Sequence, residues 1–406
     1  MTEAVIVSTA RTPIGRAFKG SLTSARPDDL AAFAVTEALK KVPGLDVADI
    51  DDLILGCGQP AGEAGFNIGR AVAVKLGFDS LPGTTVNRYC SSSLQTTRMA
   101  FHAIKAGEGS AFISAGVEAV SRFGNGMADM STAQNPVFAD AVARTAATVE
   151  AAPDEWHDPR QDGLAPDVYI AMLQTAENVA LWKNISREDM DEFACRSQNL
   201  AEKAIANGFW EREISAYTLE DGTVVSADDC PRAGVTVEGM AGLKAVSGRA
   251  NGRITAGNAC PLNDGAAALV VMSDEKAAQL GLTPLARIIS TAVTGLSPEV
   301  MGHGPAEAIK LALKRANKAV DDIDLYEINE AFASQVLSSQ REVGIDMERL
   351  NVSGGAIAVG HPFGMTGARI TGTLINNLQT YDKTFGVESM CVGGGMGMAM
   401  VIERLS

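Results

Sequence analysis

The sequence predicts an α/β fold built from two related halves. Short apolar segments of strand type alternate with longer segments of helical periodicity, which indicates mostly parallel sheets covered by helices. The chain has 406 residues, more than one hydrophobic core usually holds, so two or three domain-sized units are expected. A faint repeat of residues 48–53 (ADIDDL) by residues 321–325 (DDIDL) indicates that two of these units are a duplication.

The N-terminal half is the better marked of the two. Strands are expected at 4–8, 53–55, 84–87 and 111–115, and helices at 28–42, at 67–76 and after Cys90. The first of these helices ends at Pro43-Gly44. In the helix after Cys90, Leu94, Phe101 and Ile104 share one face, and Gly107 ends the helix. Cys90 is therefore expected at a strand-to-helix junction.

The C-terminal half repeats this order. Strands are expected at 287–290, 325–328, 351–353, 387–391 and 398–402, and helices at 306–319, from 331 and around 370–378. Ile50 lies 40 residues before Cys90, and Ile323 lies 38 residues before His361. If a pseudo-two-fold axis relates the halves, Cys90 and His361 occupy near-equivalent junctions that could face each other.

Between the halves the pattern changes. We expect residues 1–120 to form the first part of the N-terminal half, 121–250 a loop domain inserted over the active site, 251–275 the return to that half, and 276–406 the C-terminal half. The proline-rich segment 153–167 is expected to be a surface loop. Ser186, followed by Asp189, indicates the start of a helix that runs toward Gly208.

The overall charge is strongly negative. A net charge of −15 argues against nucleic acid and against an anionic membrane surface as partners. An anionic ligand would need a local group of cations. Lys244, Arg249 and Arg253 form such a group beside a glycine-rich segment, although they could equally be three solvated surface cations.

Cysteine use and the absence of targeting signals favour the cytoplasm. The six cysteines are scattered and form no Cys-x-x-Cys pair, so no metal site or redox dithiol is expected and a reducing compartment is favoured. No signal peptide precedes the first strand, no apolar run reaches membrane-spanning length, and the last residues are not a peroxisomal signal.

Cys90 and His361 are the leading candidates for catalysis. A thiol at the N-terminus of a helix can be stabilised as a thiolate by free N–H groups and the helix dipole. Cys90 could instead be a buried structural cysteine. His361 follows glycines that let the backbone turn tightly, and Pro362 fixes the exit. Of the other histidines, His102 lies in a predicted helix, His157 lies in the acidic loop, and His303 is the main rival for a substrate contact.

Two further residues complete the candidate site. Cys391 begins a Cys-x-Gly-x-Gly pattern with Gly393, where a strand that ends in glycines can expose a side chain and offer N–H donors to an oxyanion. Asn329 follows a predicted strand, at the carboxyl end where α/β sheets bind ligands. Its amide could hold a water or orient a histidine, or it could cap the next helix.

These motifs, in this order, resemble those of the thiolases, and the similarity covers essentially the whole chain. Besides the motifs around Cys90, Asn329, His361 and Cys391, it includes Arg11-Thr12-Pro13-Ile14-Gly15, Gly116-Val117-Glu118, Thr175-Ala176-Glu177-Asn178, Ala256-Gly257-Asn258 and Leu262-Asn263-Asp264-Gly265-Ala266. The resemblance implies a duplicated, five-layered α-β-α-β-α fold and a homodimer or homotetramer.

The resemblance also implies roles for the candidate residues. Cys90 would take the acyl group, His361 would accept its proton, and Cys391 would move the proton at the acetyl α-carbon. One oxyanion hole would use His361 and a water on Asn329, and the other the backbone N–H groups of Cys90 and Gly393. Coenzyme A (CoA) is then a substrate, and no metal or other cofactor is implied. The positions that resemble the CoA and acyl pocket are Met172, Ala256, Gly257, Cys260, Leu262, Met301, Ala331 and Phe332.

One departure from the family affects the choice of substrate. Thiolases that make acetoacetyl-CoA often carry a histidine where this chain has Ala171. The string from Asn87 to Ser92 looks more like that of degradative 3-ketoacyl-CoA thiolases, so thiolytic cleavage is favoured over a biosynthetic acetyl-CoA C-acetyltransferase. Two rival functions stay open: a ketoacyl synthase, which uses one cysteine and two histidines, and a non-catalytic thiolase-like protein that binds acyl-CoA or lipids.

Overall fold

The computed structural model describes residues 2–406, and its strands form two sets with the same spatial order. In the N-terminal half the order is β1-β8-β5-β3-β4, and in the C-terminal half it is β9-β12-β11-β10. The bounds are Ala4–Arg11 (β1), Asp52–Gly56 (β3), Gly83–Val86 (β4), Ala111–Ala119 (β5), Asn263–Ser273 (β8), Ala286–Gly295 (β9), Leu325–Ile328 (β10), Phe385–Val392 (β11) and Met396–Arg404 (β12). This shared order confirms the duplication.

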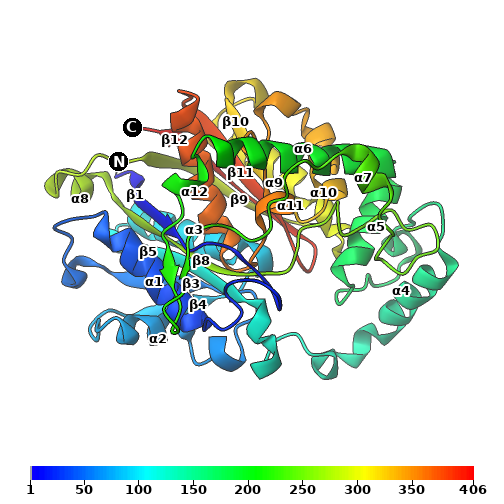
Figure 1. The fold of residues 1–406 in the computed structure, drawn as a ribbon, viewed down its shortest axis with the longest axis horizontal. Helices are drawn as coiled ribbons and strands as arrows, with labels where there is room; N and C mark the ends of the chain where they lie inside the picture. The colour runs from blue at the N-terminus through cyan, green and yellow to red at the C-terminus, as the bar shows by residue number, and fades with distance from the viewer. Residues whose placement is uncertain (1) are drawn as a thin grey trace.

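The two sets join through their first strands. β1 and β9 pair side by side, with Val5 opposite Arg287 and Ile6 opposite Ala286. Among the described residues the result is one ten-stranded sheet, with the short β2 (Gly15–Arg16) attached to β8. In Figure 1 the blue and cyan strands of the N-terminal half lie at the lower left, and the red strands β11 and β12 of the C-terminal half lie above them.

The sheet is mixed, so the prediction of mostly parallel sheets is wrong. β3 pairs in parallel with β4 and β5, and β10 pairs in parallel with β11. The last strand of each half, β8 or β12, instead runs antiparallel to both of its neighbours. β8 was not predicted as a strand because its residues, buried on both faces, show no alternation of apolar and polar side chains.

Helices cover the sheet in layers. The helices are α1 (Pro27–Lys40), α2 (Ile68–Lys75), α3 (Ser92–Ala106), α8 (Asp274–Gln279), α9 (Gly304–Ala316), α10 (Ala333–Val343), α11 (Ala356–Val359) and α12 (Thr366–Thr380). α1 and α2 pack on the N-terminal strands, α9 packs on the C-terminal strands with α10 beside it, and α3 and α12 pack against each other near the centre of Figure 1.

Three hydrophobic cores separate these layers, and the strand residues alternate between them. In β1, Val5 and Val7 belong to the core under α1, whereas Ala4 and Ile6 belong to the central core around α3 and α12. In β12, Val401 faces the core under α9 and α10, while its neighbours face the central core. The order helix, strand, helix, strand, helix confirms the five-layered fold.

One expected strand is absent. Residues 351–353 form a turn, and only Leu350 bridges to Tyr326, at the place where the N-terminal half has β4. Asn351 has a left-handed φ of 46°, which ends an extended segment. Its side chain accepts a hydrogen bond from the N–H of Ile328 (2.9 Å) and donates one to the carbonyl of Ile328 (2.9 Å), as a neighbouring strand would.

The segment between the halves is largely helical. It contains α4 (Ala139–Ala151), α5 (Met172–Trp182), α6 (Arg187–Ala206), α7 (Val237–Ala241) and a small sheet of β6 (Tyr217–Thr218) and β7 (Val224–Val225). α4, α5 and α7 lie at the right of Figure 1. Ser186 and Asp189 form the predicted capping box at the start of α6. The predicted domain boundaries stay a prediction.

Candidate active site

Cys90 lies at the junction expected for it. It sits in a short 3-10 turn, Tyr89–Ser91, that leads directly into α3. Tyr89 has a left-handed φ of 43°, which is strained for a residue with a Cβ atom. The turn places Cys90 on the wall of a pocket of about 490 Å³. The pocket is lined from one side by Gly393 and Gly394 and from the other by residues of the segments 128–134 and 168–172.

His361 occupies the equivalent position before α12. It is 1% exposed, and its backbone N–H donates to Oδ1 of Asn263 (2.8 Å). Thr366 already donates its hydroxyl hydrogen to the carbonyl of Pro362, so Nδ1 of His361 must donate to the Thr366 hydroxyl at 2.6 Å. The remaining nitrogen, Nε2, is then free of hydrogen and can accept a proton.

Asn329 lies beside that free nitrogen. It follows β10, and its Nδ2 is 3.3 Å from Nε2 of His361. Its Oδ1 is buried and has no hydrogen-bond partner among the described residues. A buried carbonyl oxygen of this kind requires a donor, which fits a bound water. The cap of α10 is Phe332, so the suggested role of Asn329 as a helix cap is wrong.

Cys391 and Gly393 approach from the end of β11. Cys391 is fully buried, and this burial raises the pKa of its thiol. A negative charge on Cys90 would raise that pKa further, so the two sulfur atoms are close neighbours. The backbone N–H groups of Gly393 and of Cys90 itself lie near the sulfur of Cys90 and lower the pKa of its thiol. The turn that carries Cys90 contacts both β11, which carries Cys391, and α12, which follows His361, and Asn329 in turn contacts His361. Four distant segments of the chain therefore meet around Cys90.

Electrostatics keeps the resting site neutral. Burial raises the pKa of the Cys90 thiol to about 12, with a smaller contribution from the nearby Glu118, and the two N–H groups only partly oppose this. Burial, together with the positive charge of Arg369, lowers the pKa of His361 to about 3. The expected thiolate at a helix N-terminus is thus replaced by an uncharged thiol and an uncharged imidazole.

A second pocket, of about 300 Å³, lies on the other side of Cys260. Ala256 and Gly257, two of the predicted CoA contacts, line it together with Ala259 and Pro261, which flank Cys260. Negative charge at Cys90, in the first pocket, or at Cys230, in the second, would raise the pKa of the Cys260 thiol, so Cys260 lies near both residues. The segment around Cys260 therefore connects the two pockets.

The other predicted CoA contacts divide into two groups. Met172 lines the pocket of Cys90. Leu262 is 49% exposed and lines neither pocket, and Met301, Ala331 and Phe332 are buried in the core under α9 and α10. Ala331 still supports the site, because its carbonyl accepts a hydrogen bond from the N–H of Cys260 (3.0 Å).

The predicted group of cations does not form a surface patch. Arg249 is buried and donates to the side chains of Gln174 (2.7 Å) and Asn178 (2.7 Å) in α5. Arg253 donates to the carbonyl of Ile185. Arg16 and Arg232 line the second pocket instead. The sequence does not mark them as a pair, because they lie far apart in the chain and only folding brings them to the same pocket.

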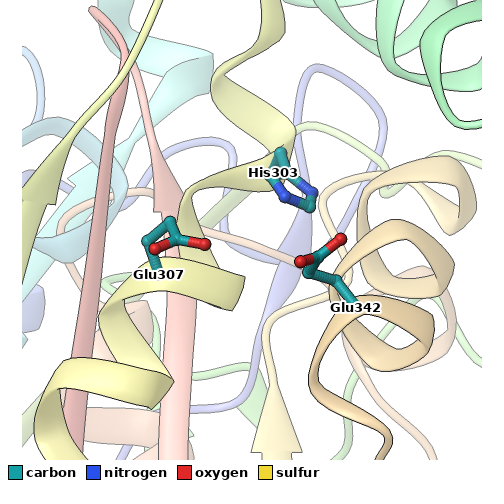
Figure 2. Close-up of side chains that lie close together, drawn as sticks. All are labelled: His303, Glu307 and Glu342. Carbon is teal, nitrogen blue, oxygen red and sulfur yellow. The ribbon is translucent and has the colours of Figure 1, made fainter.

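His303 lies outside both pockets. Figure 2 shows its ring pointing toward the carboxylates of Glu307, on α9, and Glu342, on α10. Lys310 contacts both carboxylates, at 3.2 Å and 2.8 Å, and Lys183 contacts Glu342 at 3.2 Å. These ammonium groups already neutralise the carboxylates, so the cluster is a network of ion pairs around a structural histidine.

The fold and the site together define a class of enzyme. Two duplicated halves meet with a thiol and an imidazole at equivalent junctions, and a second thiol and backbone donors lie beside them. This is an arrangement for acyl transfer through a cysteine.

Comparisons with known proteins agree with this class. Residues 4–275 match the family model "Thiolase, N-terminal domain", and residues 282–404 match "Thiolase, C-terminal domain". The chain is 43% identical to the 3-ketoacyl-CoA thiolase of Bacillus subtilis (strain 168), over 99% of this chain and 100% of that protein. It is 42% identical to a beta-ketoadipyl-CoA thiolase of Acinetobacter baylyi (strain ATCC 33305 / BD413 / ADP1), over the full length of both.

A solved structure shows the same fold. The dimeric peroxisomal thiolase of Saccharomyces cerevisiae superposes with a TM-score of 0.87 at 34% identity, over 99% of this chain and 97% of that chain. The chain belongs to the thiolase family and is an acyltransferase.

Proposed function

We propose that this thiolase cleaves 3-ketoacyl-CoA with CoA, giving acetyl-CoA and a shortened acyl-CoA, and that Cys90 carries the acyl group. Cys90 and His361 stand at equivalent junctions before α3 and α12, two helices that pack together, and Nε2 of the imidazole carries no proton. This is the main observation in support. Asn329 and Gly393 supply donors around the reacting carbonyl oxygens.

The first half of the reaction forms the acyl-enzyme. The sulfur of Cys90 attacks the 3-keto carbon while its proton moves to Nε2 of His361. The bond between C2 and C3 then breaks, and its electron pair leaves as the enolate of acetyl-CoA. Cys391 gives its proton to C2 of this enolate, which completes acetyl-CoA and leaves a thiolate at Cys391.

The second half returns every group to its starting state. The thiol of CoA gives its proton to the Cys391 thiolate, and its sulfur attacks the acyl carbonyl on Cys90. The Cys90 sulfur leaves and recovers the proton held by His361. Protons and electrons balance without a metal or a redox cofactor, so CoA is the only co-substrate required.

The uncharged resting site suits this sequence. A thiol with a raised pKa is a poor nucleophile alone, and an imidazole with a lowered pKa is a weak base. The negative charge at Cys90 and the positive charge at His361 become favourable only when they form together, during attack on the 3-keto carbon of a bound substrate. The N–H groups of Cys90 and Gly393 then stabilise negative charge at the same point.

We place CoA in the second pocket. Its phosphates would lie near Arg16 and Arg232, which are exposed cations on the pocket wall in a protein of net charge −15. The pantetheine arm would pass the segment around Cys260 to reach Cys90. The acyl chain would then occupy the pocket of about 490 Å³.

The size of this pocket supports a degradative role. An acetoacetyl group has only four carbons, whereas the pocket extends from Cys90 to residues 128–134 and 168–172. Ala171, which replaces the histidine frequent in biosynthetic thiolases, lies between Ile170 and Met172 on this wall. The Bacillus subtilis relative is named a 3-ketoacyl-CoA thiolase, in agreement with this direction.

We propose a homodimer in the cytoplasm. β4 is the last strand of the sheet, so one side of it can pair with a second copy. The nearby Phe66 is 98% exposed, which suits burial in an interface. The six cysteines are free, as in a reducing compartment. Within residues 2–406, no helix is long and apolar enough to span a bilayer.

Removal of one sulfur tests the proposal. CoA-dependent loss of the 3-keto chromophore should be measurable with 3-oxohexanoyl-CoA and should fall at least about 1,000-fold in Cys90→Ala. Cys195→Ala removes a thiol in α6 that lines neither pocket and should retain activity. Undiminished turnover in Cys90→Ala would show that the nucleophile is wrongly assigned.

A further inference from the structure

The pocket that leads away from Cys90 has an unusual charge. Its lining contains one carboxylate, that of Asp129, and no lysine, arginine or histidine. The remaining wall combines apolar side chains such as Met130, Ile170 and Phe363 with neutral polar ones. An acyl chain that enters this pocket therefore meets one fixed anion and no cation.

Asp129 is held in place by a single buried glutamine. Oε1 of Gln59, which is 8% exposed, accepts hydrogen bonds from the backbone N–H groups of Ala128 (2.9 Å) and Asp129 (2.8 Å). Nε2 of the same side chain donates to Oδ2 of Asp129 (2.7 Å). Three hydrogen bonds to one side chain fix the carboxylate at the rim rather than leaving it free to swing away.

The carboxylate also lies beside the residue that precedes the nucleophile. Tyr89, the residue before Cys90, has the pKa of its phenol raised first by burial and then by the charge of Asp129 and a hydrogen bond to it. Asp129 itself is exposed, and it lines the pocket of Cys90. It can therefore act on a substrate that reaches the pocket mouth.

We propose that Asp129 makes this enzyme select 3-ketoacyl-CoA substrates with an uncharged acyl chain over those whose chain ends in a carboxylate. The inference rests on the proposed function and adds the substrate class. A terminal carboxylate would lose water in the pocket, meet no cation and be repelled by Asp129. A neutral chain has none of these costs. Sequence identity does not distinguish charged from uncharged acyl chains as substrates, because the relatives at 43% and 42% identity are named for substrates of both kinds.

Two substrates of equal carbon number test the proposal. 3-Oxohexanoyl-CoA and 3-oxoadipyl-CoA both carry six-carbon 3-keto chains and differ in the terminal carboxylate. For the wild type, kcat/KM should be at least about tenfold higher for 3-oxohexanoyl-CoA, which corresponds to the cost of one poorly solvated, repelled charge. The ratio of kcat/KM for 3-oxohexanoyl-CoA to kcat/KM for 3-oxoadipyl-CoA is the measured quantity. Added salt should reduce this ratio, because Asp129 is exposed to solvent and salt screens its charge.

The matched variants are Asp129→Asn and Glu108→Gln. Asp129→Asn removes the charge, while the asparagine oxygen can still accept the hydrogen bond from Gln59 and keep the loop in place. The ratio should therefore fall about fivefold. Glu108→Gln makes the same change in net charge at an exposed position outside the pocket and should leave the ratio unaltered.

The outcomes separate this inference from the proposed function. If the wild type cleaves both substrates equally well, or if Asp129→Asn leaves the ratio unchanged, the charge selection is wrong while thiolysis stands. If a folded wild-type enzyme cleaves neither substrate, the proposed function fails, and the inference fails with it.

Discussion

At Cys90, burial and hydrogen bonding act on the thiol in opposite directions. Removal from water and the buried Glu118 favour the protonated form, whereas the N–H groups of Cys90 and Gly393 favour the thiolate. Burial is the larger effect. Glu118 is itself tied to the site, because it accepts hydrogen bonds from the N–H groups of Gly58 (2.8 Å) and Gly364 (2.9 Å), and its pKa is raised by burial to about 7.

The raised pKa of Cys90 can be tested by alkylation. The thiolate is the reactive form, so the rate at which iodoacetamide modifies Cys90 should keep rising with pH above 8.5, by about tenfold per unit while the thiol is mostly protonated. Peptide mass spectrometry identifies the modified cysteine. A rate that levels off below pH 8 would show that the two N–H groups, rather than burial, control the thiol.

The principal residues of the site could be predicted because each lies in a short local motif. A cysteine before a helix, or a histidine after glycines, carries its signal within about ten residues of chain. Asp129, Arg16 and Arg232 carry no such signal, since their places depend on how loops fold over the two pockets. The same reason explains Arg249, whose basic neighbours in the sequence gave no indication that it is buried against α5.

At the scale of elements, the contact between α3 and α12 brings the two junctions together. Cys90 precedes the first helix and His361 the second, so the distance between these helices controls the distance between the reacting groups. Gly367 makes the close contact possible, because a Cβ atom on it would lie 2.2 Å from the backbone nitrogen of Leu94. The backbone of α3 cannot move aside for a Cβ atom as a flexible side chain could, so any larger residue at position 367 would push the two helices apart.

Two glycines of the same helix provide a matched test of this contact. Gly367→Ala should lower the free energy of unfolding by at least about 2 kcal/mol, because the added methyl group must push α12 away from α3. At Gly372 the nearest atom would lie at 3.5 Å, an ordinary contact, so Gly372→Ala should be neutral or stabilise by up to about 1 kcal/mol through helix propensity.

Urea denaturation of both variants measures these differences. Activity should fall with stability in Gly367→Ala, since the same shift moves Cys90 relative to His361. Equal stability of the two variants would show that the helices can separate without cost, and that their contact does not set the geometry of the site.

Element boundaries were predictable where the periodicity was clear. β10 and the capping box of α6 fall where expected, because each has a local pattern. The mixed character of the sheet was not predictable, because it depends on how β8 and β12 pair with strands that lie elsewhere in the chain. No local pattern gives the direction of such a strand. Residues 351–353 failed as a strand for a local reason, since the side chain of Asn351 takes the place of a strand partner.

At the scale of the whole molecule, the central layer encloses a group of buried charges. None of the three guanidinium nitrogens of Arg369, in α12, has a hydrogen-bond partner among the described residues. Glu327, on β10, and Glu388, on β11, interact with this positive charge, yet burial raises the pKa of each to about 8. Arg369 also helps to keep His361 unprotonated, so this group connects the interior to the active site.

Glu388 offers a test of what these charges do to stability. Its pKa is about 8 in the folded protein against an ordinary value of 4.5, so the folded state binds the proton more tightly than the unfolded state does. Stability must therefore fall as pH rises from about 4.5 to about 8. Glu388→Gln cannot lose a proton, and its N–H can replace the protonated carboxyl group as the donor to Thr371, whose own hydroxyl hydrogen goes to the carbonyl of Gly367.

The free energy of unfolding of Glu388→Gln, relative to the wild type, should accordingly increase by at least about 1 kcal/mol between pH 5 and pH 8. Denaturant unfolding at the two pH values measures the change, and Glu108→Gln, an exposed carboxyl, should show no such trend. A constant difference between wild type and Glu388→Gln would mean that Arg369 compensates the carboxylate fully. The central layer would then hold an ion pair at neutral pH instead of a protonated acid beside an unpaired guanidinium.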